Sequence, residues 1–205
     1  MRSMLKDGMR LAGVLVAMTA AIAVQAQGDA TRGKQIGYTC LGCHGIENYK
    51  NVYPTYSVPM LVGQHPEYIE AALKAYRARE RSHATMYAQA SSLSDQDISD
   101  IAAYLSGTAL ATGATAVGQA PAKVTELCAT CHGKDGVGIV GMYPTLAGQH
   151  ADYLERALVE YQKGDRKNPV MGPFAAQLSA ADVKQIAAYY AAQQPPLKTV
   201  ARKSW

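Results

Sequence analysis

The chain has 205 residues, of which 48% are hydrophobic and 18% are charged. This length suits one or two compact domains, and the composition is that of an ordinary globular protein rather than a disordered one. The formal net charge is only +4 at pH 7, which is too small to favour a partner such as nucleic acid or anionic lipid.

The first 26 residues have the pattern of a secretory signal peptide. A basic start contains Arg2, Lys6 and Arg10, an apolar run covers residues 11–24, and the small residue Ala26 ends a cleavage-site pattern. The apolar run is shorter than the roughly 20 residues that span a bilayer. We therefore expect residues 1–26 to be cleaved rather than retained as an anchor, and in a bacterium this predicts a periplasmic protein.

The pentapeptide C-x-x-C-H occurs twice and uses all four cysteines. It is the attachment signature of a c-type haem, in which both thiols form thioethers with the porphyrin and the histidine ligates the iron. A redox dithiol or a disulfide needs no following histidine, and a zinc site would require the two pairs to converge. The pattern predicts two covalently bound haem c groups, attached through Cys40, Cys43, Cys128 and Cys131, with His44 and His132 as iron ligands.

The chain repeats itself at an offset of 85 residues. The segment PMLVGQH at residues 59–65 falls on PTLAGQH at residues 144–150, whereas the haem motifs are 88 residues apart. The first copy therefore has three extra residues in a loop. We expect two domains at residues 27–105 and 122–205, joined by a linker of moderate flexibility at residues 106–121. Each copy is small, so the haem is expected to complete its apolar core.

The periodicity predicts helices and no sustained strand, so the expected fold class is all-α. A short helix leads into the first haem motif, a weaker one leads into the second, and an amphipathic helix follows in each copy. Capping boxes at Ser94 with Asp97 and at Ser179 with Asp182 begin the last helices. The helices expected before the last one cover residues 31–38 and 66–79 in the first copy and residues 124–127 and 151–161 in the second.

Two methionines that match between the copies, Met86 and Met171, are candidates for the second axial ligand. They follow the haem motifs at a distance that allows the chain to run around the haem, and we expect both to lie in loops before the last helix. A matched methionine often serves only core packing, but a position outside the helical periodicity favours thioether ligation. The alternatives are His65 and His150, which also match and each open a helix.

The order C-x-x-C-H, then Pro-x-Leu-x-Gly, then a methionine before a final helix resembles the class I cytochrome c domain. Two such domains after a signal peptide resemble the di-haem cytochrome c4 family. The resemblance implies that Pro59 and Pro144 accept a hydrogen bond from His44 and His132, and that the domains face each other across a pseudo-twofold axis. The alternative for each proline is that it only ends a loop.

Class I domains often hold a tryptophan near the haem, but this chain has only Trp205. Other side chains must then hold the haem propionates. Our candidates for binding the propionates are four polar residues, a glutamine and an arginine at matched positions in each copy. The alternative is that each arginine is only solvated and each glutamine only caps a helix. These candidates are Gln64, Arg81, Gln149 and Arg166.

The resemblance implies an electron-transfer protein and not an enzyme, because an iron with both axial positions filled exchanges one electron and binds no substrate. The implied partners are a quinol-oxidising complex and a terminal oxidase of a respiratory chain, with peripheral membrane association through them. The alternative is a di-haem electron-accepting subunit of a flavoprotein dehydrogenase, such as a sulfide-oxidising flavocytochrome c. A di-haem peroxidase would need an open iron position, which the two methionines disfavour.

Overall fold

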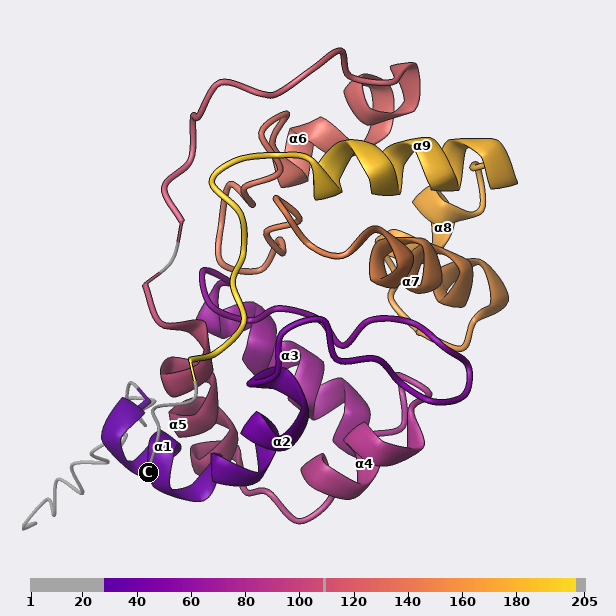
Figure 1. The fold of residues 1–205 in the computed structure, drawn as a ribbon. Helices are drawn as coiled ribbons and strands as arrows, with labels where there is room; N and C mark the ends of the chain where they lie inside the picture. Colours follow the sequence, from indigo (N-terminus) through magenta and orange to yellow (C-terminus); the bar gives the residue numbers. More distant parts are fainter. Residues whose placement is uncertain (1–27, 109, 202–205) are drawn as a thin grey trace, which may run out of the picture.

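The computed structural model describes residues 28–108 and 110–201, which form two helical domains (Figure 1). The predicted signal peptide and Trp205 lie outside these residues. Within them, the regular structure is helical and the only strand-like pairing consists of isolated β-bridges, so the all-α prediction is confirmed. No helix in this part of the chain is long and apolar enough to cross a membrane.

The first domain packs its helices around the last of them. The core joins α5 to α1 and α3 through apolar residues such as Ile69, Leu73, Ile98 and Ile101. A loop of extended chain connects the haem motif on α2 to α3 (Figure 1). The elements are α1 (Ala30–Ile36), η1 (Tyr38–Cys40), α2 (Leu41–His44), α3 (Pro66–Arg77), α4 (Ala84–Ala90) and α5 (Asp95–Ser106).

The second domain repeats this plan without a separate first helix. A wide helical turn leads directly into the second haem motif, and α7 packs against α9 and α8 around Val124, Leu154, Ile186 and Tyr190. The weak pattern before this motif therefore corresponds to a single distorted turn. The elements are η2 (Val124–Cys128), α6 (Ala129–His132), α7 (Ala151–Lys163), α8 (Met171–Ala175) and α9 (Ala180–Ala191).

Both predicted capping boxes are present. The Ser94 hydroxyl accepts from the Asp97 N–H at 3.1 Å, and the Asp97 carboxylate accepts from the Ser94 N–H at 3.0 Å. Ser179 and Asp182 make the same pair of contacts at 3.2 and 2.9 Å. Each box pairs two N–H groups that a helix start otherwise leaves free, so α5 and α9 begin at the predicted residues.

The prediction that Met86 and Met171 lie in loops was wrong. Met86 is in α4 and Met171 begins α8. His83 is the N-cap of α4, and its Nδ1 accepts the Met86 N–H at 3.2 Å. α8 has no side-chain bond at its own N-cap, Val170, but Asn168 Oδ1 caps the preceding turn and accepts the Met171 N–H at 2.8 Å. Helices of five to seven residues are too short to produce a recognisable hydrophobic period.

The two domains meet in a buried seam with pseudo-twofold symmetry. Gln64 donates to the Thr145 carbonyl at 2.9 Å and accepts from the Thr145 N–H at 2.8 Å. Gln149 makes the same two bonds with Met60, both at 3.0 Å. Both glutamines are buried, and the 85-residue offset relates one pair to the other, Gln64 to Gln149 and Met60 to Thr145. The repeat in the sequence is thus also a symmetry of the interface.

The C-terminal segment of the second domain crosses to the first, where it is visible as the yellow chain descending from α9 (Figure 1). Lys198 and Val62 exchange backbone hydrogen bonds at 2.9 and 3.0 Å. Val200 is 5% exposed within the core of the first domain, and its N–H donates to the His44 carbonyl at 3.1 Å. We call residues 193–201 the C-terminal strap.

The linker crosses in the opposite direction and is anchored on the second domain. The N–H groups of Gly113 and Ala114 donate to the buried Asp135 carboxylate at 2.9 and 3.0 Å. Val117 exchanges two hydrogen bonds with the Gln193 side chain, at 2.8 and 3.0 Å. These contacts hold the linker against the second domain, and its moderate flexibility stays a prediction.

Candidate functional site

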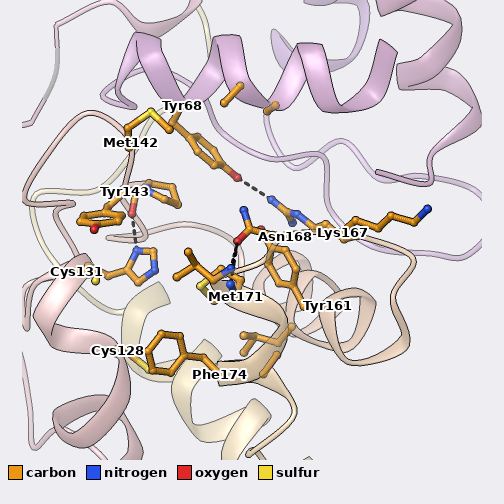
Figure 2. A pocket seen from close by; sticks show the side chains of 18 of the residues that line it. Tyr68, Cys128, Cys131, Met142, Tyr143, Tyr161, Lys167, Asn168, Met171 and Phe174 are labelled. Carbon is orange, nitrogen blue, oxygen red and sulfur yellow. Dashed lines mark hydrogen bonds between the residues drawn. The ribbon is translucent and has the colours of Figure 1, made fainter. Parts of the chain in front are cut away.

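In each domain a cavity brings the sequence-predicted cysteines, histidine and methionine together. In the second domain the cavity is lined by Cys128, Cys131, His132 and Met171 (Figure 2). The corresponding cavity of the first domain is lined by their repeat counterparts. The alternative axial ligands His65 and His150 are not among the lining residues, and the His65 ring instead donates from Nε2 to the Gly138 carbonyl at 3.0 Å.

The histidine of each haem motif is oriented by the carbonyl that the resemblance implied. His44 Nδ1–H donates to the Pro59 carbonyl at 2.9 Å, and His132 Nδ1–H donates to the Pro144 carbonyl at 2.9 Å. Burial lowers the pKa of both imidazoles, which favours the neutral form. A neutral ring that carries its proton on Nδ1 leaves the Nε2 lone pair free, as a metal ligand requires.

The four cysteines lie partly buried on the helical turns η1–α2 and η2–α6 and form no disulfide with one another. Burial raises the pKa of Cys40, and it raises the pKa of Cys128 to about 11. A raised pKa disfavours the thiolate form of Cys40 and Cys128. In the part of the chain that the structure describes, no three His, Cys, Asp or Glu side chains gather as a metal site.

Two arginines from opposite domains are buried where the cavities approach the seam. The segments that carry Arg81 and Arg166 pair with each other in an antiparallel bridge. Arg81 donates to the Tyr153 hydroxyl at 3.2 Å, and Arg166 donates to the Tyr68 hydroxyl at 2.6 Å. Each guanidinium also lies over a tyrosine ring of its own domain, Tyr76 or Tyr161, at 4.4 and 4.6 Å.

These arginines have no carboxylate partner among the ion pairs of the described residues. Burial alone raises the pKa of Tyr68, but the positive charges of Arg166 and Arg81 outweigh it and lower that pKa. Arg166 Nε is also buried without a hydrogen-bond partner. A buried cation with an unused donor is costly unless an anion pairs with it. We therefore expect a negatively charged group to bind beside Arg81 and Arg166, where the cavities approach the seam.

The residues therefore fit a haem in each cavity. Two thiols are placed to tether it, a neutral imidazole and a thioether are available as axial ligands, and the buried guanidiniums match the charge of its propionates. The structure gives Gln64 and Gln149 a second role at the domain interface, and their contact with a propionate stays a prediction. Sequence reasoning missed Tyr68 and Tyr153 as hydrogen-bond partners, although their match between the copies was a usable signal.

The side chains that accept the Met86 and Met171 N–H groups lead to a prediction about how firmly the methionines are held. Replacing Asn168 by alanine removes the acceptor for the Met171 N–H and should cost about 0.5–2 kcal/mol of local stability. We expect the thioether of Met171 to detach from the iron at a lower temperature than in the wild type. This detachment is measured as loss of the thioether-to-ferric-haem charge-transfer band on heating.

His83→Asn gives α4 the same capping residue type that precedes α8 and should preserve the band, whereas His83→Ala should weaken it. Equal behaviour of these two His83 variants would contradict a capping role.

Comparison with known families identifies the class. The family model described as cytochrome c matches residues 30–109. The model described as cytochrome C oxidase, cbb3-type, subunit III matches residues 116–189. Together with the fold and the cavities, these matches define a c-type cytochrome built from two cytochrome c domains, a class that carries covalently bound haem c and transfers electrons.

Relatives of nearly full length identify the family. Cytochrome c-552 of Acidithiobacillus ferridurans is 34% identical over 86% of this chain and 82% of its own length. Cytochrome c4 of Pseudomonas aeruginosa is 33% identical over 80% of this chain and 88% of its own. The chain belongs to the cytochrome c4 family, and it is an electron-transfer protein rather than an enzyme.

Two further comparisons bear on structure and partner. The solved cytochrome c4 of Acidithiobacillus ferrooxidans superimposes with a TM-score of 0.60 at 31% identity, covering 76% of this chain and 99% of that one. A protein of Stutzerimonas stutzeri named thiosulfate dehydrogenase electron acceptor is 30% identical over 88% of this chain and 93% of its own length. This chain is thus also similar to a protein that is named for a dehydrogenase partner.

Proposed function

We propose that this chain is a periplasmic carrier of electrons with two haem c groups, working in a respiratory chain between a quinol-oxidising complex and a terminal oxidase. The observation that carries the proposal is that each domain has its own cavity lined by two cysteines, a histidine and a methionine. A bound haem iron supplies the ability to take up and release one electron. The protein binds the porphyrin through Cys40, Cys43, Cys128 and Cys131.

The axial residues keep each iron available for electron exchange alone. His44 and His132 would hold the haem iron, with their tautomer fixed by hydrogen bonds to the Pro59 and Pro144 carbonyls. The thioethers of Met86 and Met171 would be the second iron ligands, and such ligation raises the reduction potential. With both ligands in place, no iron position would be left for a substrate, and the haem would supply one-electron exchange alone.

A redox titration with haem quantification tests this function. We expect two haems per chain, a thioether-to-ferric-haem charge-transfer band, and two one-electron steps. One haem per chain, or carbon monoxide binding readily to the reduced native protein, would overturn the proposal. Fractionation of the source cells tests the location, because a periplasmic protein is released with the periplasmic contents and has lost residues 1–26.

A second candidate function is that of electron acceptor for a dehydrogenase. It is favoured by the similarity to the thiosulfate dehydrogenase electron acceptor over 88% of this chain. The alternative named in the sequence analysis was a flavoprotein dehydrogenase, such as a sulfide-oxidising flavocytochrome c, as the partner in such a role. Co-purification distinguishes these functions, because a dehydrogenase subunit should bring down a catalytic chain and a respiratory carrier should purify alone.

We also propose that Arg81 and Arg166 pair with the haem propionates across the seam. Removing either positive charge should favour the ferric state and lower the potential of the affected haem. The expected change is on the order of tens of millivolts, since a charge interaction of about 1 kcal/mol corresponds to roughly 40 mV for one electron. Arg81→Gln and Arg166→Gln are compared with Arg77→Gln, an arginine paired with Asp95 outside the cavities. Unchanged potentials in both cavity variants would remove this role.

A further inference from the structure

The glutamine of the second domain contacts the same peptide group that holds the histidine of the first haem motif. The Pro59 carbonyl accepts the Nδ1–H of His44 at 2.9 Å. The N–H of this peptide group belongs to Met60, and it donates to the side-chain oxygen of Gln149 at 3.0 Å. The peptide is trans, so its C=O and N–H point in opposite directions. His44 and Gln149 therefore bind the two ends of one peptide group.

The repeat reproduces this arrangement with the domains exchanged. The Pro144 carbonyl accepts the Nδ1–H of His132 at 2.9 Å. The N–H of the same peptide group belongs to Thr145, and it donates to the side-chain oxygen of Gln64 at 2.8 Å. Each haem-motif histidine is thus joined, through a single peptide group, to a side chain of the opposite domain. We call each of these two arrangements a glutamine relay.

The surroundings of each glutamine dictate how its amide is oriented. The side-chain oxygen also accepts the N–H of the next residue, which is His65 at 3.0 Å for Gln64 and His150 at 3.1 Å for Gln149. Backbone N–H groups can only donate, so the amide must present its oxygen to them. The two glutamines are 3% and 4% exposed, which keeps water from competing. In such a site, successive hydrogen bonds polarise one another.

We infer that Gln64 and Gln149 are positioning residues that set the reduction potential of the opposite domain's haem through the histidine. Accepting the N–H of a peptide group draws electron density onto its carbonyl oxygen, which then accepts more strongly from the imidazole Nδ1–H. The imidazole gains negative character and becomes a stronger donor to iron, which favours the ferric state. This inference rests on the proposed function, in which His44 and His132 are iron ligands.

Substitution of each glutamine by methionine, which has a similar length and no amide, tests the inference in the holoprotein. Gln149→Met should raise the potential of the first haem, and Gln64→Met that of the second. At the wild-type midpoint, the Fe(II) to Fe(III) ratio of the affected haem should rise at least about twofold, equivalent to about 18 mV. Nuclear magnetic resonance of the reduced protein follows the histidines directly. In Gln149→Met the Nδ1–H resonance of His44 should move upfield, because its hydrogen bond weakens, while that of His132 stays in place.

The chain offers a matched control in Gln193. This glutamine is fully buried, and its side chain makes the same pair of bonds with the Val117 backbone, at 2.8 and 3.0 Å, but that peptide group holds no histidine. Gln193→Met should lose a similar amount of stability and leave both Nδ1–H resonances and both potentials unchanged. Gln149→Glu, studied at a pH where the carboxyl group is ionised, keeps an oxygen acceptor with more negative charge. It should move the His44 resonance downfield and lower the potential of the first haem.

The relay predicts an effect that crosses the seam, so three results overturn it. These are a glutamine variant that moves the histidine of its own domain, one that moves both histidines equally, and one that moves neither. A changed potential with an unmoved Nδ1–H resonance also overturns it, because the glutamine would then act on the haem directly, as a propionate partner does. Haem content and the charge-transfer band are measured on the same samples. A wild type without two haems contradicts the proposed function itself, whereas a normal wild type with silent glutamine variants contradicts only the relay.

Discussion

Replacing Met171 by alanine should remove about half of the thioether-to-ferric-haem charge-transfer band and open the second iron to carbon monoxide. Met171 begins α8 and lines the same cavity as His132. It is the methionine of the second domain that matches Met86 in the repeat. Loss of this ligand should also lower the potential of the second haem substantially, because axial ligands set haem potentials over a range of about 0.8 V. Spectroscopy of the purified variant with and without carbon monoxide measures the result.

The chain offers a matched control for this variant. Met142 lines the same cavity but is 65% exposed and has no counterpart in the first domain. Met142→Ala should retain the full band. The corresponding pair in the first domain is Met86→Ala, which should remove the other half of the band, with Met60→Ala as its control, since Met60 lines that cavity too. A full band in the Met171 and Met86 variants would show that these residues only pack in the core.

Ending the chain after Leu197 should destabilise the first domain more than the second, although the missing residues follow the second domain in sequence. The deletion removes buried Val200, both hydrogen bonds between Lys198 and Val62, and the bond from Val200 to the His44 carbonyl. Burial of one such side chain contributes about 1.5–3 kcal/mol and each net hydrogen bond about 0.5–1.5 kcal/mol. After the entropy of ordering the strap is deducted, we expect a loss of about 2–5 kcal/mol, a large share of the 5–15 kcal/mol of a typical domain.

Two measurements check this deletion. Thermal unfolding should show that the first domain, which carries His44, unfolds at a lower temperature than in the full-length protein. The reduction potential of the first haem should change in the same variant. A chain that ends after Ala201 keeps every described strap contact, so it should match the full-length protein. Equal destabilisation of both domains by the deletion would indicate that the strap stabilises the interface between the domains and not specifically the first haem site.

The local chemistry was readable from the sequence because it depends on neighbouring residues. The haem motifs and the capping boxes at Ser94 and Ser179 involve short spacings, whereas the roles of Pro59 and Pro144 beside His44 and His132 followed from the family resemblance. Comparing the copies extended this to Met86 and Met171, since residues that match across a repeat have the same surroundings. The short helices around these methionines were missed because they contain too few residues to show a period.

What the tertiary structure decided is how the copies are joined. Gln64 and Gln149 bond to the backbone of the opposite domain, and Arg81 and Arg166 reach tyrosines across the seam. The matched positions marked these residues as candidates but did not show whether their side chains contact their own domain or the other one. A repeat in the sequence describes the structure within each domain and does not specify how the two domains pack together. The crossing of the strap onto His44 likewise depends on residues 156 positions apart, Val200 and His44, and only packing brings such distant residues together.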